Sequence, residues 1–253
     1  MKVEHTSVII TGGASGLGAA TARLFAKAGA KVALFDTNLV AAKILAEEIG
    51  ALPVLCNVAD EESVKKAIEI VKYKNGAARI LINCAGIGAS ERIVGRNGVM
   101  TLNDFSKVIN VNLIGTFNML RLCAAEMILL QATDDEERGV IISTASVAAY
   151  EGQIGQAAYA ASKGGIVSLT LPAAREFAQF GIRVNTIAPG IFETPLLKGL
   201  SGEAQKGIID AIPFPKRLGA SEEFAKLALH IADNNYINGE TIRIDGALRM
   251  QPK

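Results

Sequence analysis

Short apolar runs alternate with longer amphipathic runs along almost the whole chain, and this alternation restricts the fold more than any other feature. Each apolar run has the length of a strand, and each run between them has the length and apolar spacing of a helix. Strands that alternate with helices pair in parallel, because each helix returns the chain to the starting edge of the sheet. We therefore predict an α/β fold with a parallel sheet covered by helices on both faces.

The runs also give the order of the elements. Strands are predicted at 7–11, 31–36, 52–56, 80–83, 139–144, 183–188 and 240–244, and helices at 16–28, 39–49, 61–74, 104–131, 157–180 and 221–232. Two longer segments interrupt this order: the polar, glycine-containing loop 88–103 and the proline-containing loop 194–220. Long insertions in a compact domain often form lids or binding loops. We expect one domain over residues 1–253, with 194–220 as the candidate substrate loop.

Composition and charge exclude few classes of function. The chain has 26 basic and 25 acidic residues, a formal net charge of +1, so charge gives no argument for nucleic acid or membrane partners. Cys56, Cys84 and Cys123 lie in apolar surroundings, and their odd number favours reduced, buried thiols over a disulfide framework. We see no signal peptide and no apolar stretch long and uninterrupted enough to span a bilayer. We expect a cytoplasmic protein, or a mitochondrial-matrix protein if the source is eukaryotic.

A glycine-rich turn, TGGASGLG at 11–18, follows the first predicted strand directly. Gly12, Gly16 and Gly18 have the spacing G-x-x-x-G-x-G, and glycine permits a tight turn with close approach of a ligand to the backbone. The helix that follows offers free N–H groups and the positive end of its dipole to a pyrophosphate. A dinucleotide-binding fold needs such a turn between its first strand and first helix, so we predict a dinucleotide cofactor.

Asp36 ends the second predicted strand, 18 residues after Gly18. A carboxylate at this position can accept hydrogen bonds from both hydroxyls of an adenosine ribose, and it repels a 2′-phosphate. Thr37 and Asn38 follow it, so no arginine is adjacent to bind such a phosphate. The sequence therefore favours NAD over NADP.

Tyr159 and Lys163 lie four residues apart in a predicted helix and so project from one face. A tyrosine with its ordinary pKa of about 10 is protonated at neutral pH, and a nearby cation lowers that pKa by stabilising the phenolate. Lowering it by about three units requires roughly 4 kcal/mol. The spacing alone fits either a proton acceptor or a surface packing pair.

Further motifs reveal a family resemblance. The chain resembles the short-chain dehydrogenase/reductase family over essentially its full length, through TGGASGLG at 11–18, NCAG at 83–86, VNLIG at 111–115, Ser146, AYAASK with Tyr159 and Lys163, and PGIFETP at 189–195. Ser146 precedes Tyr159 by 13 residues, the interval usual in the family. The resemblance implies a doubly wound Rossmann fold. It is greatest to the members that oxidise 3-hydroxyacyl-CoA and 17β-hydroxysteroids.

The resemblance also implies catalytic roles. Tyr159 would take the proton of the substrate hydroxyl in oxidation and return it in reduction. Lys163 would lower the pKa of Tyr159 and bind the nicotinamide ribose, and Ser146 would orient the reacting oxygen. Asn112, in a helix interior where asparagine is disfavoured, would hold a water that links Lys163 to solvent. Alone, Ser146 reads as a turn cap and Asn112 as bonding within its helix.

Cofactor residues are implied in the same way. Besides Tyr159 and Lys163, they are Gly12, Ser15, Gly16, Leu17 and Gly18 of the phosphate turn, Asp36 at the adenosine ribose, Asn57 and Val58 at the adenine, Cys84, Ala85 and Gly86 beside the ribose, and Pro189, Phe192 and Thr194 on the nicotinamide side. The family usually has aspartate where this chain has Asn57, so the adenine contact loses a charge. No metal ligands are expected, and Cys84 is no nucleophile candidate, because no histidine partner is evident.

The expected activity is reversible, NAD-dependent oxidation of a (3S)-3-hydroxyacyl-CoA to the 3-ketoacyl-CoA, a reaction of fatty acid metabolism, with Lys198 and its loop helping to seat the acyl-CoA. A hydroxysteroid or secondary-alcohol dehydrogenase is the nearest alternative. A 3-oxoacyl carrier-protein reductase is disfavoured by Asp36, and a non-catalytic NAD-binding scaffold by the intact Ser146, Tyr159 and Lys163. The helices 104–131 and 157–180 are apolar on more than one face, and family members commonly pair through them, so we expect a homotetramer.

Overall fold

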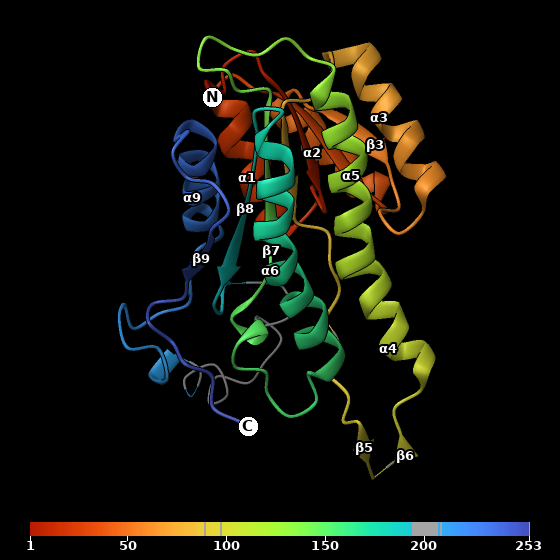
Figure 1. Cartoon of the computed structure of the whole chain (residues 1–253). Coiled ribbons are helices and arrows are strands. Elements are labelled where there is room, and N and C mark those ends of the chain that lie inside the picture. The colour runs from red at the N-terminus through yellow and green to blue at the C-terminus, as the bar shows by residue number, and fades with distance from the viewer. Residues whose placement is uncertain (89, 97, 194–206, 208, 253) are drawn as a thin grey trace.

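A parallel sheet of seven strands forms the centre of the molecule (Figure 1). The structure is a computed structural model that describes the chain apart from residues 89, 97, 194–206, 208 and 253. The strands lie in the order β3-β2-β1-β4-β7-β8-β9. They are β1 (Ser7–Thr11), β2 (Lys31–Asp36), β3 (Leu52–Leu55), β4 (Ile80–Asn83), β7 (Gly139–Thr144), β8 (Ile182–Pro189) and β9 (Thr241–Ile244). The predicted α/β class and doubly wound sheet are confirmed.

Helices cover both faces of this sheet, so its central strands are apolar on both sides. One face packs on α1 (Gly16–Lys27), α2 (Leu39–Ile49) and α9 (Ser221–Asp233), where Phe25 and Phe224 are fully buried. The other face packs on α3 (Glu61–Asn75), α5 (Gly115–Ile128) and α6 (Ala157–Ala178), where Met119 is fully buried. Because all seven strands are parallel, their carboxyl ends lie together at one edge of the sheet.

The direction of strand order reverses between β1 and β4. β1 pairs with β2 on one side and with β4 on the other, with Thr11 opposite both Phe35 and Asn83. The connections leaving the two strands therefore run to opposite sides and leave a crevice at their carboxyl ends. The glycine-rich turn after Thr11 and the NCAG segment after β4 both lie at this point.

The predicted helix 104–131 is interrupted by a π-helical segment. The structure has α4 (Leu102–Ile109), the π segment η1 (Asn110–Ile114) and α5 as one continuous helical run. Extra residues in a helical turn are rare and are often found at functional sites. Here the π segment contains Asn112, which is completely buried.

This helical run also corrects the prediction about membrane-spanning stretches. The run Leu102–Ile128 is long and apolar enough, by length and composition, to cross a membrane, so the prediction that no such stretch exists was wrong. Half of its most apolar window is buried inside the protein, and the core helix of a soluble protein passes the same test, so the finding is weak evidence for a membrane span.

The loop predicted at 88–103 contains a small hairpin that the sequence did not reveal. β5 (Val94–Gly95) pairs antiparallel with β6 (Gly98–Val99), and the hairpin projects beyond the first turn of α4 (Figure 1). Glu91 N–H donates to Gly155 O at 2.8 Å, which attaches the base of the hairpin to the segment before α6. Of the candidate substrate loop 194–220, most residues, including Thr194 and Lys198, lie outside the described part of the chain.

Candidate cofactor and active site

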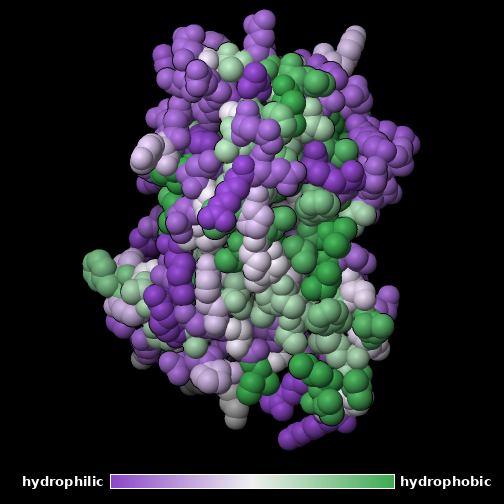
Figure 2. All heavy atoms as spheres, in the orientation of Figure 1, coloured by the Kyte–Doolittle hydropathy of each residue, from purple (hydrophilic) through white to green (hydrophobic). Residues whose placement is uncertain are grey.

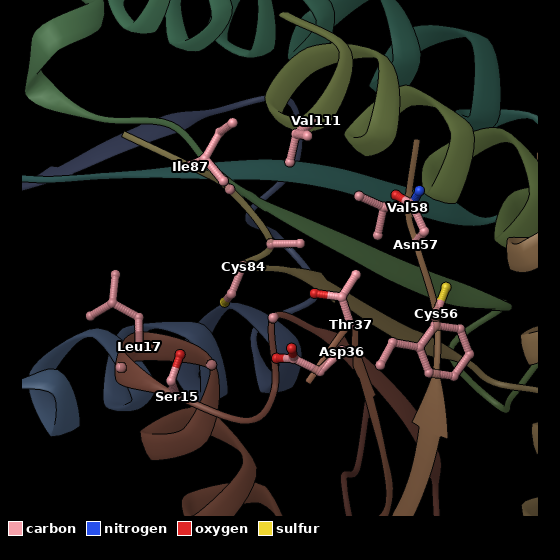
Figure 3. A pocket seen from close by; sticks show the side chains of 16 residues that line it. Ser15, Leu17, Asp36, Thr37, Cys56, Asn57, Val58, Cys84, Ile87 and Val111 are labelled. Atoms are coloured by element: carbon pink, nitrogen blue, oxygen red, sulfur yellow. The ribbon is translucent and has the colours of Figure 1, made fainter. Parts of the chain in front are cut away.

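A cavity of about 400 Å³ opens at the carboxyl ends of β1, β2 and β4 (Figure 3). Eleven of the predicted cofactor residues line it: Gly12, Ser15, Gly16, Leu17, Gly18, Asp36, Asn57, Val58, Cys84, Ala85 and Gly86. Five further lining residues were not predicted: Phe35, Thr37, Cys56, Ile87 and Val111. Each of these five lies next to a predicted residue in the sequence. The predicted segments were therefore in the right places but included too few residues.

Close packing explains two of the glycines in the turn. A Cβ on Gly18 would lie 2.2 Å from Gly12 O, and a Cβ on Gly12 would lie 2.8 Å from the backbone of Ala85. Gly12 also has a φ of +62°, a left-handed conformation that favours glycine. The turn can therefore pass directly over the end of β4 and leave the N-terminus of α1 facing the cavity, which fits a pyrophosphate.

Asp36 is partly buried at the end of β2 and holds the turn in place. Its Oδ2 accepts from Ala14 N–H at 3.0 Å, and its Oδ1 accepts from Asn38 N–H at 2.9 Å. A carboxylate has about four acceptor positions, so each oxygen retains one that can accept a ribose hydroxyl. The carboxylate is thus oriented before any ligand binds.

The opposite wall is fixed by backbone contacts of Asn57 and Val58. Asn57 Oδ1 accepts from Ala59 N–H at 3.1 Å, and Asn57 N–H donates to Ser63 Oγ at 3.0 Å. Asn118 Nδ2, on α5, donates to Val58 O at 2.9 Å. The amide oxygen of Asn57 keeps one free lone pair, so it can accept a single further hydrogen bond from an adenine.

Ser146, Tyr159 and Lys163 come together beside this cavity. Ser146 follows β7 and caps the short 3-10 helix η2 (Val147–Ala149), with its Oγ accepting from Ala148 N–H at 3.1 Å. Burial raises the pKa of the Tyr159 phenol, and a hydrogen bond with Ser146 partly offsets that rise. The ammonium of Lys163 lies 5.7 Å from the centre of the Tyr159 ring. A phenol, a hydroxyl and an ammonium thus converge at one point.

The ammonium of Lys163 is buried within the fold. Its side chain is 5% exposed, and Nζ donates to Thr144 O, at the end of β7, at 2.7 Å. Burial lowers the pKa of Lys163 to about 8. A Cβ on Gly86 would lie 3.6 Å from Nζ, so the ammonium is adjacent to the cavity wall.

This lowered pKa makes the stability of the cofactor-free protein depend on pH. Below about pH 8 the lysine is charged in both the folded and the unfolded protein, so the cost of burying its charge fully reduces stability. Between about pH 8 and its ordinary pKa of 10.5, only the unfolded chain keeps the proton, so the folded state becomes more stable as pH rises. We expect the wild type to gain about 2–3 kcal/mol over this interval relative to Lys163→Met. Urea unfolding at pH 7.5 and pH 10 measures the difference, with exposed Lys66→Met as the control. Parallel pH profiles for wild type and Lys163→Met would contradict it.

Asn112 connects the cavity wall to α6. Its Oδ1 accepts from Ile87 N–H at 2.8 Å, and its Nδ2 donates to Ile87 O at 3.0 Å and to Ser162 Oγ at 3.0 Å. Both amide protons of Asn112 therefore have partners, and these partners lie outside the helix that carries Asn112. Ser162, which the sequence did not single out, is one of those partners.

The three cysteines are free thiols, as predicted. Cys56 and Cys123 are buried, but Cys84 is only partly so because it lines the cavity. Burial raises the pKa of Cys84 to about 11 and that of Cys56 to about 12. Both are protonated at neutral pH, which is unfavourable for a nucleophile. Among the described residues, no group of three or more His, Cys, Asp or Glu side chains could hold a metal ion.

The residues predicted for the nicotinamide side lie further along the sheet. Pro189 ends β8, and Phe192 is 5% exposed and pairs through its backbone with Gly219. Neither lines the cavity described above, and Thr194 lies outside the described residues. The structure therefore brings together the residues predicted for the adenosine and phosphates, and separately those predicted for proton transfer; their roles, like the contribution of Thr194, stay predictions.

Comparisons with known proteins agree with this arrangement. A family model described as short chain dehydrogenase matches residues 6–205. The chain is 48% identical to the 3-hydroxyacyl-CoA dehydrogenase type-2 of Rattus norvegicus, covering 99% of this chain and 98% of that protein. The protein of the same name from Drosophila melanogaster is 45% identical over 99% of this chain and 100% of its own length. A 3-oxoacyl-[acyl-carrier-protein] reductase of Thermotoga maritima is 37% identical, covering 98% of this chain and 99% of its own.

A solved structure gives the same result in three dimensions. The crystal structure of 3-hydroxyacyl-CoA dehydrogenase type-2 from Mycobacterium avium superimposes with a TM-score of 0.94 and is 44% identical in sequence. The match covers 98% of this chain and 97% of that one. Dehydrogenases of this kind use a nicotinamide cofactor, and the cavity has the glycine turn and the strand-end carboxylate that such a cofactor needs. On sequence, fold and site, the chain belongs to the short-chain dehydrogenase/reductase family.

Proposed function

We propose that this protein catalyses the NAD-dependent, reversible oxidation of (3S)-3-hydroxyacyl-CoA to 3-ketoacyl-CoA. The observation that carries the proposal is the convergence of Ser146, Tyr159 and the buried ammonium of Lys163 beside the cofactor cavity. Full-length identity of 45–48% to proteins named 3-hydroxyacyl-CoA dehydrogenase type-2 supports the substrate class. A hydroxyacyl-CoA is a small molecule, as dehydrogenase substrates generally are.

The residues divide the work of the reaction. Tyr159 takes the proton of the substrate hydroxyl as the hydride leaves carbon, and returns it in the reverse direction. Ser146 donates to the reacting oxygen and holds it near the phenol. We propose that the charge of Lys163, whose ammonium lies 5.7 Å from the centre of the Tyr159 ring, adds to the hydrogen bond with Ser146 in favouring the phenolate against burial. When bound, the nicotinamide supplies the hydride acceptor.

Lys163 and Asn112 are also proposed to connect this proton to solvent. Among the described residues, Lys163 Nζ has one hydrogen-bond partner, Thr144 O, and an ammonium has three donors. We infer that the other two serve a ribose hydroxyl and a water held near Asn112.

Asp36 is proposed to select NAD. We expect Asp36→Ala/Thr37→Arg to lower kcat/KM with NAD by about tenfold or more, because charge-assisted hydrogen bonds to the ribose are lost. Activity with NADP should rise, because a guanidinium can now bind the 2′-phosphate. Steady-state assays with both cofactors measure the ratio. Asp104→Ala, on α4 and outside the cavity, is the matched control and should leave the ratio unchanged. An unaltered ratio in the double variant would contradict the assignment.

A substrate panel tests the proposed function. NADH formation is followed with (3S)-3-hydroxyacyl-CoAs of several chain lengths, with a 17β-hydroxysteroid and with a simple secondary alcohol. The proposal expects the highest kcat/KM with an acyl-CoA. A higher value with the steroid or the alcohol would assign the nearest alternative. No turnover with any of them would favour a non-catalytic NAD-binding scaffold.

A carrier-protein reductase is the second candidate, since such an enzyme is 37% identical over nearly the full chain. The carboxylate of Asp36 argues against it, because it repels the phosphate of NADPH. Reduction of a 3-oxoacyl carrier-protein substrate with NADPH, faster than oxidation of hydroxyacyl-CoA with NAD, would favour this candidate.

We also propose that residues 1–253 act as one NAD-binding unit and assemble as a homotetramer through α4–α5 and α6. Exposed apolar side chains along this side support the proposal, among them Ile114, Phe117 and Leu171. Figure 2 shows hydrophobic surface over the region of α4 and α5. Sedimentation of the purified protein tests the assembly, and a monomer at micromolar concentration would contradict it.

A further inference from the structure

We propose that Ser162 is a positioning residue for proton transfer, which ties the turn of α6 that carries Tyr159 and Lys163 to Asn112. The inference rests on the function proposed above. It concerns a side chain with no direct access to a substrate, because Ser162 is 0% exposed.

Two hydrogen bonds fix the hydroxyl of Ser162. Its Oγ donates to Tyr159 O at 2.7 Å and accepts from Asn112 Nδ2 at 3.0 Å. A hydroxyl has one proton, so donation to Tyr159 O leaves its lone pairs for Asn112. The serine therefore joins the backbone of the tyrosine to the asparagine with a defined direction.

The other end of this connection reaches the cofactor cavity. Asn112 exchanges two hydrogen bonds with the backbone of Ile87, which lines the cavity, at 2.8 and 3.0 Å. Asn112 Oδ1 also lies 3.2 Å from the place of a Cβ on Gly86, and Lys163 Nζ lies 3.6 Å from it. A continuous path of hydrogen bonds thus runs from the cavity wall, through Asn112 and Ser162, to the turn that carries the phenol.

Packing alone does not explain a serine at this position. Four other residues of the first turns of α6, at 157, 158, 160 and 161, are alanine, which has the highest helix propensity. Serine is less favourable than alanine in a helix interior. Its presence here is therefore better explained by a hydrogen bond that alanine cannot make. Asn112 is the partner in that hydrogen bond, because without Ser162 one of its buried amide protons would have no acceptor.

The experiment compares Ser162→Ala with a matched variant of the same helix. Thr170, also buried, donates to Ile166 O at 2.8 Å and contacts Thr186 Oγ1 at 2.6 Å, but it lies away from Tyr159. We expect Ser162→Ala and Thr170→Val each to lower the melting temperature by about 2–8 °C. Only Ser162→Ala should lower kcat, by roughly 10- to 100-fold, with KM for NAD and the NAD dissociation constant unchanged within twofold.

A double variant shows whether the effect passes through Asn112. If it does, Ser162→Ala/Asn112→Ala should have the kcat of Asn112→Ala alone, because the shared connection is already broken. Three results would overturn the proposal: a kcat for Ser162→Ala within twofold of wild type, an equal loss in Thr170→Val, or fully additive losses in the double variant. If Ser162→Ala does not fold, Ser162→Cys replaces it, since its weak S–H donor should give a smaller loss of the same kind.

Failure of this inference differs from failure of the proposed function. If the wild-type protein oxidises no hydroxyacyl-CoA, the function itself is wrong, and Ser162 has no proton transfer to position. If wild type is active and the Ser162 variants match it, the inference alone fails.

Discussion

Tyr159→Phe should bind NAD normally and yet produce almost no NADH. We expect kcat to fall by about 10²–10⁴-fold, the range typical for loss of a general acid–base group. Phenylalanine keeps the ring in its partly buried position, so the fold is preserved and only the proton acceptor is lost. Tyr159 is also one of the predicted cofactor residues, but it does not line the cavity where the adenosine and phosphates are expected, so the dissociation constant of NAD should change little.

NADH absorbance with a 3-hydroxyacyl-CoA measures the rate, and calorimetric titration measures NAD binding. Tyr236→Phe is the control, because this fully exposed tyrosine lies outside the site, and its rate should equal that of wild type. The assignment of Tyr159 fails if Tyr159→Phe retains more than about a tenth of the wild-type rate, given that a general acid–base group contributes at least 10²-fold.

Gly18→Ala should disrupt both the cavity and the stability of the fold. The added Cβ would lie 2.2 Å from Gly12 O, and this contact is with backbone that no flexible side chain can relieve. The turn must therefore move away from α1. We expect a loss of about 1–3 kcal/mol in the free energy of unfolding, as for overpacked cores, and roughly a 10- to 100-fold rise in the dissociation constant of NAD.

Gly50→Ala separates local strain from this clash. Gly50 follows α2 with a φ of +69°, and apart from its chain neighbours no described residue has an atom within 4 Å of its Cβ position. The alanine there should cost about 1–2 kcal/mol of left-handed strain and leave NAD binding unchanged. Urea unfolding and calorimetric titration compare the two variants. Wild-type affinity for NAD in Gly18→Ala would contradict the proposed role of the turn.

The strands could be predicted almost to the residue because each is a short apolar run, and the central ones, β1, β4, β7 and β8, are buried on both sides. β1, β2, β4 and β7 have the predicted bounds. The ends of α6 and β8 differ by one or two residues, as helix and strand ends usually do, because terminal turns fray. The cavity could be predicted because its residues directly follow strands, so that parallel topology alone brings them to one edge.

Features that depend on contacts between distant residues were not predictable from local pattern. The π segment at Asn110–Ile114 contains Asn112, whose partners Ile87 and Ser162 are 25 and 50 residues away in the sequence. The hairpin at Val94–Val99 has strands of only two residues each, too short for alternation to be recognised. The direction of the Tyr159 pKa shift depends on burial, which a spacing of four residues does not report.

The order of functional residues along the chain has a consequence for how such enzymes diversify. Every described residue that lines the cofactor cavity precedes residue 112, whereas Ser146, Tyr159 and Lys163 follow β7. The exposed connection between α5 and β7 separates the two sets and lies at the edge of the sheet opposite the cavity. A single genetic crossover in that connection would exchange the adenosine-binding half while keeping the acid–base half intact. On the proposed roles, such a recombinant would exchange the adenosine contacts separately from the acid–base group, and it would have to preserve the hydrogen bonds that join Asn112 to Ile87 and Ser162.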